Sequence, residues 1–102
     1  MSISYGWEKL HLAIHSLTGN GTQAERLLEA VTFNLSSITA ENDLPTELQR
    51  EFLDLMESFR QLEPTGDEGV FAATINTLGE MERRAAIHSI ISLYDKVCGH
   101  NN

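Results

Sequence analysis

Apolar side chains recur along this chain at intervals of three and four residues, the spacing of one face of an α-helix. The first series predicts a helix over residues 5–17, and its apolar face consists of Trp7, Leu10, Ile14 and Leu17. Ser4 is a suitable N-cap for this helix. The glycine-rich segment 18–21 then predicts that the helix stops and the chain turns.

A second helix is predicted to begin at Thr22. Thr22 and Glu25 have the spacing of a capping box, in which each side chain satisfies a backbone N–H group that the helix leaves unpaired. The apolar face that follows is Ala24, Leu27, Leu28, Val31, Leu35 and Ile38. The helix is expected to fade near Ser36 and Ser37, because their hydroxyl groups compete for backbone hydrogen bonds. A polar linker is expected from Thr39 to Leu44.

Pro45 suits the first turn of a third helix, predicted over residues 45–62. Its apolar positions are Leu48, Phe52, Leu55, Phe59 and Leu62. A turn is expected over residues 64–67 and a short helix of two to three turns between residues 68 and 78. Gly79 is predicted to cap the last helix, whose wide apolar face is Ile87, Ile90, Ile91, Tyr94, Val97 and Cys98. This width predicts that the last helix is central and packs against at least two neighbours.

Four long helices and one short helix predict an all-α fold, a small antiparallel helical bundle. The chain has 102 residues, a length that one hydrophobic core normally serves, so residues 1–102 are expected to form a single domain. Residues 1–12 contain charged Glu8 and Lys9, which argues against a signal peptide. The single cysteine, Cys98, cannot form an intrachain disulfide, and a cytoplasmic location is therefore expected.

The charge of the chain is unevenly distributed. Fifteen acidic residues against seven Lys and Arg give a net charge of −8, which argues against binding to nucleic acids or anionic membranes. Residues 41–68 hold nine of the acidic residues and two of the basic ones, a local net charge of −7. Two interpretations remain open for this region: a solvated face that keeps the protein soluble, or a docking surface for a basic partner protein. The docking surface would be formed by Glu47, Glu51, Asp54 and Glu57.

Glu8, His11 and His15 are the candidate metal ligands, because their spacing aligns them along one side of the first predicted helix. The second Glu-x-x-His of a carboxylate-bridged di-iron site does not occur, and the three side chains border the apolar face, so a row exposed to solvent is the competing interpretation. The chain contains no phosphate-binding loop, nucleophile elbow, Cys-x-x-Cys pair or calcium loop. These absences predict a protein without catalytic activity or cofactor.

Three functional hypotheses follow. The first is a non-enzymatic, acidic interaction protein of the small bacterial regulator, inhibitor or immunity type. The second is a small-molecule or metal-binding bundle that uses the Glu/His row, or an aromatic-lined pocket formed by Trp7, Thr74 and Asn76. The third is a homodimer that buries an apolar strip of the first or last helix. Phe33 lies off the apolar face of its helix and is expected either to pack on the short helix or to form an exposed contact.

Overall fold

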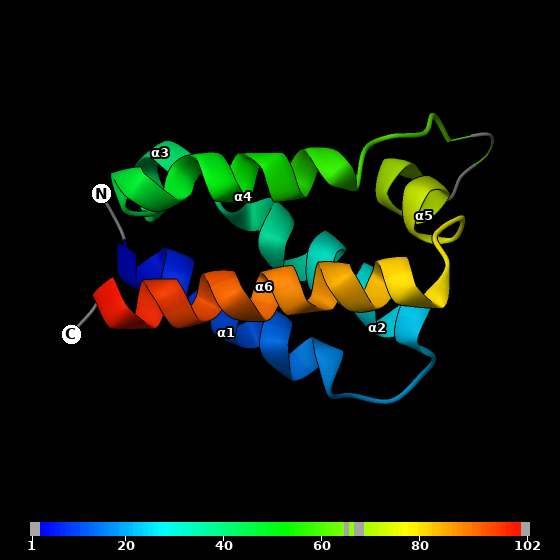
Figure 1. Cartoon of the computed structure of the whole chain (residues 1–102), viewed down its shortest axis with the longest axis horizontal. Coiled ribbons are helices and arrows are strands. Elements are labelled where there is room, and N and C mark those ends of the chain that lie inside the picture. The colour runs from blue at the N-terminus through cyan, green and yellow to red at the C-terminus, as the bar shows by residue number, and fades with distance from the viewer. Residues whose placement is uncertain (1–2, 65, 67–68, 101–102) are drawn as a thin grey trace.

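Six α-helices make up most of the fold, and no β-strand occurs in the part of the chain that the structure describes (Figure 1). The computed structural model describes residues 3–64, 66 and 69–100. The predicted all-α class is confirmed. The predicted count of four long helices and one short helix is not confirmed, because within these ranges only α1 (Ile3–Leu17), α4 (Thr46–Ser58) and α6 (Glu80–His100) exceed seven residues.

The second predicted helix changes its geometry in the middle. The capping box is present: Glu25 N–H donates to Thr22 Oγ1 (3.1 Å) and Thr22 N–H donates to Glu25 Oε1 (2.7 Å). The regular helix α2 (Gln23–Glu29) then passes into a π-helical turn, η1 (Ala30–Asn34), and a 3-10 turn, η2 (Leu35–Ser37). The Ser36 hydroxyl donates to the Thr32 carbonyl (2.6 Å), the backbone competition expected of this residue. The helical region therefore ends where predicted, but not as one α-helix.

The predicted polar linker after Thr39 is wrong in part. It contains a one-turn helix, α3 (Ala40–Asp43), in which Ala40 and Asp43 are buried. The Asp43 carboxylate accepts a hydrogen bond from Thr39 N–H (2.7 Å), so this acidic side chain closes the turn. Helix α3 packs closely on α1 at Gly6, because a Cβ atom at Gly6 would lie 2.2 Å from the carbonyl oxygen of Asp43.

Helix α4 ends at Ser58, four residues earlier than predicted. It buries Leu48, Phe52 and Met56, and Phe59 follows as a buried C-cap. Beyond it Leu62 is exposed, and its N–H group donates to the Thr74 hydroxyl in α5 (Gly69–Ile75) at 3.1 Å. The short helix is thus present, while Thr65, Asp67 and Glu68 of the predicted turn and helix start lie outside the described residues.

Helix α6 packs against α1, α2 and α4, which confirms that it has at least two neighbours. Its buried positions are Ile90, Leu93 and Val97. The predicted apolar face is therefore correct at Ile90 and Val97, but it wrongly included Ile91, which is 39% exposed, and it omitted Leu93. Ion pairs join Glu51 to Lys96 and Glu47 to His100, and therefore α4 and α6 run in opposite directions. Figure 1 shows α6 extending along the molecule, with α4 on one side of it and α1 crossing behind it.

One apolar cluster fills the space between these helices. It includes Leu10 of α1, Leu27 of α2, Val31 of η1, Phe52 of α4 and Ile90 of α6, all of them buried. None of the described helices is long and apolar enough to cross a lipid bilayer.

Candidate functional site

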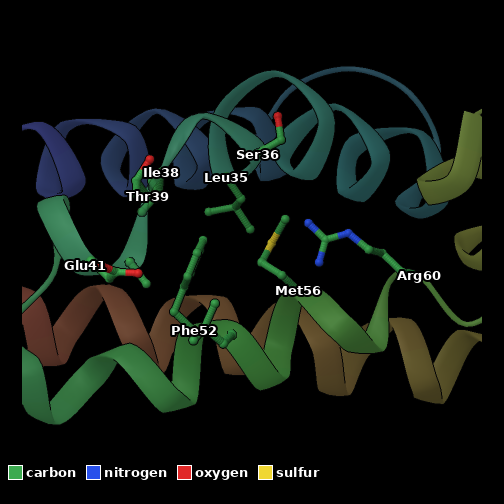
Figure 2. Close-up of a pocket in the computed structure, with 10 residues that line it drawn as sticks. Leu35, Ser36, Ile38, Thr39, Glu41, Phe52, Met56 and Arg60 are labelled. Carbon is green, nitrogen blue, oxygen red and sulfur yellow. The ribbon is translucent and has the colours of Figure 1, made fainter.

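A surface groove of about 290 Å³ lies between α4 and the segment formed by residues 35–41. Figure 2 shows Phe52 and Met56 extending from α4 toward Leu35, so the floor of the groove is apolar. Arg60 lies at one end of the groove and Glu41 at the other. An apolar floor between charged ends is typical of a site that recognises an amphipathic ligand.

The irregular end of the second helical region forms one wall of this groove. Leu35 N–H reaches back to the Ala30 carbonyl, five residues earlier, which is the hydrogen bond of a π-helical turn. The buried Asn34 amide donates to the Ser16 hydroxyl of α1 (3.1 Å) and so ties this turn to the neighbouring helix. The chain then continues through η2 into Ile38, which is buried and lines the groove.

The other wall, on α4, carries an exposed apolar side chain. Leu53 lines the groove, and 43% of its surface is accessible to solvent. Glu57 is also exposed and follows Leu53 by four residues, so the two side chains are neighbours on the helix surface. Arg60 is held at the end of the groove by a cation–π contact with the Phe71 ring of α5, 5.4 Å from its centroid.

The structure brings together three of the four predicted docking acids. Glu47, Glu51 and Asp54 line a second surface hollow, between α4 and α6, whereas Glu57 does not line it. Each of the three is paired with a basic side chain. Glu51 accepts a hydrogen bond from Lys96 (2.8 Å), Glu47 lies 3.2 Å from His100, and Asp54 lies 3.4 Å from Arg50.

These pairs change the electrostatics of the predicted acidic face. Lys96 and Arg50 offset the charges of Glu51 and Asp54, and His100 offsets that of Glu47 when it is protonated. No basic group lies within ion-pair distance of Glu57 among the described residues. Glu57, one helical turn after the groove residue Leu53, is therefore an acidic side chain of α4 whose charge no described basic group offsets, a distribution that the sequence pattern did not reveal.

A cluster of aromatic and polar side chains joins α1 to the C-terminal half of α6. Trp7 stacks on His11 with ring centroids 4.9 Å apart, and its indole N–H donates to Cys98 Sγ at 3.3 Å. His11 Nδ1 is hydrogen-bonded to the Tyr94 hydroxyl (3.1 Å), and His11 Nε2 to His15 Nε2 (3.1 Å). The cluster connects residues that are 83 and 91 positions apart in the sequence.

The environment of Tyr94 in this cluster alters the acidity of its phenol. The pKa of its phenol is raised above the usual value, first by a hydrogen bond with Cys98 and then by burial. Tyr94 therefore keeps its proton at neutral pH and acts as a neutral hydrogen-bonding partner of His11.

The structure places the residues of the two alternative sites differently from the prediction. His11 and His15 meet, but Glu8 does not join them: no group of three or more metal-ligating side chains converges anywhere in the described ranges. None of the predicted pocket residues Trp7, Thr74 and Asn76 lines either of the two surface hollows described above. Trp7 contacts Cys98, and Thr74 accepts a hydrogen bond from Leu62. Phe33 is 69% exposed, in agreement with the exposed-contact alternative.

The sequence analysis did not identify Leu53 as a residue of the groove or Tyr94 as a hydrogen-bonding partner of His11. A signal for Leu53 existed, since this leucine lies off the apolar face of its helix, as Phe33 does. Tyr94 was assigned to the apolar face of the last helix, and no local pattern connects it to His11.

Comparison with known proteins gives no further guidance, since no family model, curated protein or solved structure matches this chain.

Proposed function

We propose that this protein is a non-enzymatic binding module of the regulator, inhibitor or immunity type. It captures a basic amphipathic helix of another protein in the groove between α4 and residues 35–41. The observation that carries this proposal is the apolar floor of Phe52 and Met56 beside the exposed pair Leu53 and Glu57. Such a surface suits helix-in-groove recognition, in which apolar side chains enter the groove and polar ones meet its rim.

The charge of the region selects the kind of partner. Residues 41–68 have a local net charge of −7. Glu41 is exposed and lines the groove, and the exposed Glu57 lies one helical turn after the groove residue Leu53. Lysine and arginine side chains on the partner would be attracted to these acids, whereas Arg60 at the opposite end of the groove from Glu41 would repel them. Glu47, Glu51 and Asp54 extend the negative surface, although their ion pairs weaken their contribution. The lone Cys98 suits a reducing compartment, so we expect the module to act in the cytoplasm.

The test uses a short fluorescent peptide of leucine and lysine arranged with helical periodicity, and its leucine–glutamate counterpart. Fluorescence anisotropy is expected to show binding of the leucine–lysine peptide at low salt and much weaker binding of the other. Leu53→Asp is expected to weaken binding at least about tenfold, equivalent to about 1.4 kcal/mol, because it places a charge at the apolar contact.

A matched pair of variants separates the groove from general electrostatic attraction. Glu57→Lys and Glu29→Lys change the net charge equally, but they differ in position. Glu57 lies one helical turn after Leu53, which lines the groove, whereas Glu29 is an exposed residue of α2, a helix that contributes no residue to the groove. Only Glu57→Lys is expected to reduce binding strongly. Equal losses in both variants, or equal binding of both peptides, would show that the groove does not recognise a basic amphipathic helix. Circular dichroism confirms that each variant remains folded.

A further inference from the structure

The two histidines of α1 have the geometry of a chelating pair. His11 and His15 are one helical turn apart, and their Nε2 atoms are separated by 3.1 Å. Two imidazole nitrogens that each bind a metal ion at about 2.1 Å and lie 3.1 Å apart subtend an angle of about 95° at the metal. This angle is close to that between adjacent ligands of an octahedral or distorted tetrahedral ion. The geometry points to a surface site for a divalent transition-metal ion of the nickel, copper and zinc group, bound by His11 and His15.

The surroundings of His11 fix its ring in the orientation that binding requires. Its Nδ1 atom is engaged by the Tyr94 hydroxyl at 3.1 Å, so Nε2 is the nitrogen that faces His15. Metal-binding histidines usually donate their other ring N–H to such a partner, which selects the tautomer and orients the ring. The stacked Trp7 ring, 4.9 Å away, restricts His11 further. Tyr94 and Trp7 are therefore positioning residues of the site.

The hydrogen bond between the two histidines is the interaction that the metal replaces. One Nε2 atom donates a proton and the other accepts it, so the pair holds a single proton between the two nitrogens. When His15 moves its proton to Nδ1, both Nε2 lone pairs become available to one metal ion. His15 is exposed, which leaves room for this tautomer change and for water molecules to complete the coordination. Imidazole pairs of this kind favour nickel, copper and zinc over calcium and magnesium.

The test is titration of the full chain with Ni²⁺ at neutral pH, followed by tryptophan fluorescence. Trp7 is the single tryptophan and stacks on His11, so a paramagnetic ion bound to His11 is expected to quench its emission. The quenching should saturate at one ion per chain, and Zn²⁺ should reverse it by competition. His15→Ala is expected to weaken Ni²⁺ binding at least tenfold, and Tyr94→Phe about tenfold through loss of the positioning hydrogen bond.

Two control variants identify the ligands. His88→Ala removes an exposed histidine of α6 that lies outside the cluster, and it should leave the titration unchanged. Cys98→Ala tests the other metal-binding group near Trp7, and quenching should persist in this variant. The proposal is overturned if His15→Ala binds Ni²⁺ as tightly as the unaltered protein, or if Cys98→Ala abolishes the quenching. Neither result depends on peptide binding, so this site and the groove are tested separately.

Discussion

Gly6 permits the close contact between α1 and α3, and replacing it with alanine tests that contact directly. An alanine Cβ atom at this position would lie 2.2 Å from the Asp43 carbonyl oxygen and 3.1 Å from Leu44 Cδ2. Ordinary contact requires at least about 3.4 Å, so α3 would have to move by roughly 1 Å in a densely packed region. The nearest obstacle is backbone, which cannot move aside by rotating a side chain.

Two opposing effects determine the size of the change in stability. Alanine is a better helix former than glycine by about 1 kcal/mol, which by itself would stabilise α1. Overpacking of a close-packed site costs about 1–3 kcal/mol, and a backbone clash belongs at the upper end of this range. Gly6→Ala is therefore expected to lower the free energy of unfolding by about 2 kcal/mol.

Gly99→Ala provides the matched control. Gly99 also lies in a helix, near the end of α6, but no neighbouring atom lies within 4 Å of the position that its Cβ would occupy. The same substitution is expected to leave stability unchanged or raise it by up to about 1 kcal/mol. Urea unfolding followed by circular dichroism measures both variants. If Gly6→Ala is as stable as the unaltered protein, or if Gly99→Ala is the less stable of the two, the described contact between α1 and α3 is incorrect.

Three further predictions follow from the packing and the capping contacts. The pKa of Glu25 is lowered by its hydrogen bonds with Thr22, so its carboxylate stabilises the fold above pH 4.5. This contribution is lost as the pH falls below 4.5 and the carboxylate takes up a proton. The difference in urea midpoint between the unaltered protein and Glu25→Gln should therefore be larger at pH 7 than at pH 3. Because Leu93 is buried and Ile91 is exposed, Leu93→Ala should lower the free energy of unfolding by about 2–5 kcal/mol and Ile91→Ala by much less. Thermal and urea unfolding measure both changes, and equal losses would contradict the burial of this face of α6. Exposed apolar residues such as Leu12 and Ile91 are expected to mediate self-association, so the molecular mass measured by light scattering should increase with protein concentration. A mass of 11.4 kDa at every concentration would exclude the homodimer.

Local spacing along the chain was sufficient to predict the features that depend on residues three or four positions apart. The spacing of Leu48 and Phe52 predicted an amphipathic helix, and the capping box of Thr22 and Glu25 located the start of α2. Both signals act within a single helical turn, so they do not depend on how the helices later pack. The all-α class followed from the same local patterns.

Packing between the helices sets where one helical pattern breaks and which face of a helix is buried. Residues 30–37 keep apolar helical spacing, yet their hydrogen-bonding pattern changes as Asn34 bonds to α1. In α6, Leu93 rather than Ile91 is buried, because the neighbouring helices α1, α2 and α4 determine the direction of the core. Local propensity contains no information about that direction.

The candidate sites depended on the tertiary structure even more. Four acids of one helix suggested a docking surface, but Lys96 and His100 approach two of them from α6, and Arg50 pairs with a third. The fourth, Glu57, follows the groove residue Leu53 by one helical turn. Spacing within α1 aligned His11 and His15, while the Tyr94 contact that orients His11 comes from 83 residues away. Spacing along a helix determines which residues share its surface. The crossing of helices distant in the sequence determines the charges, rings and hydrogen-bonding groups that those residues meet.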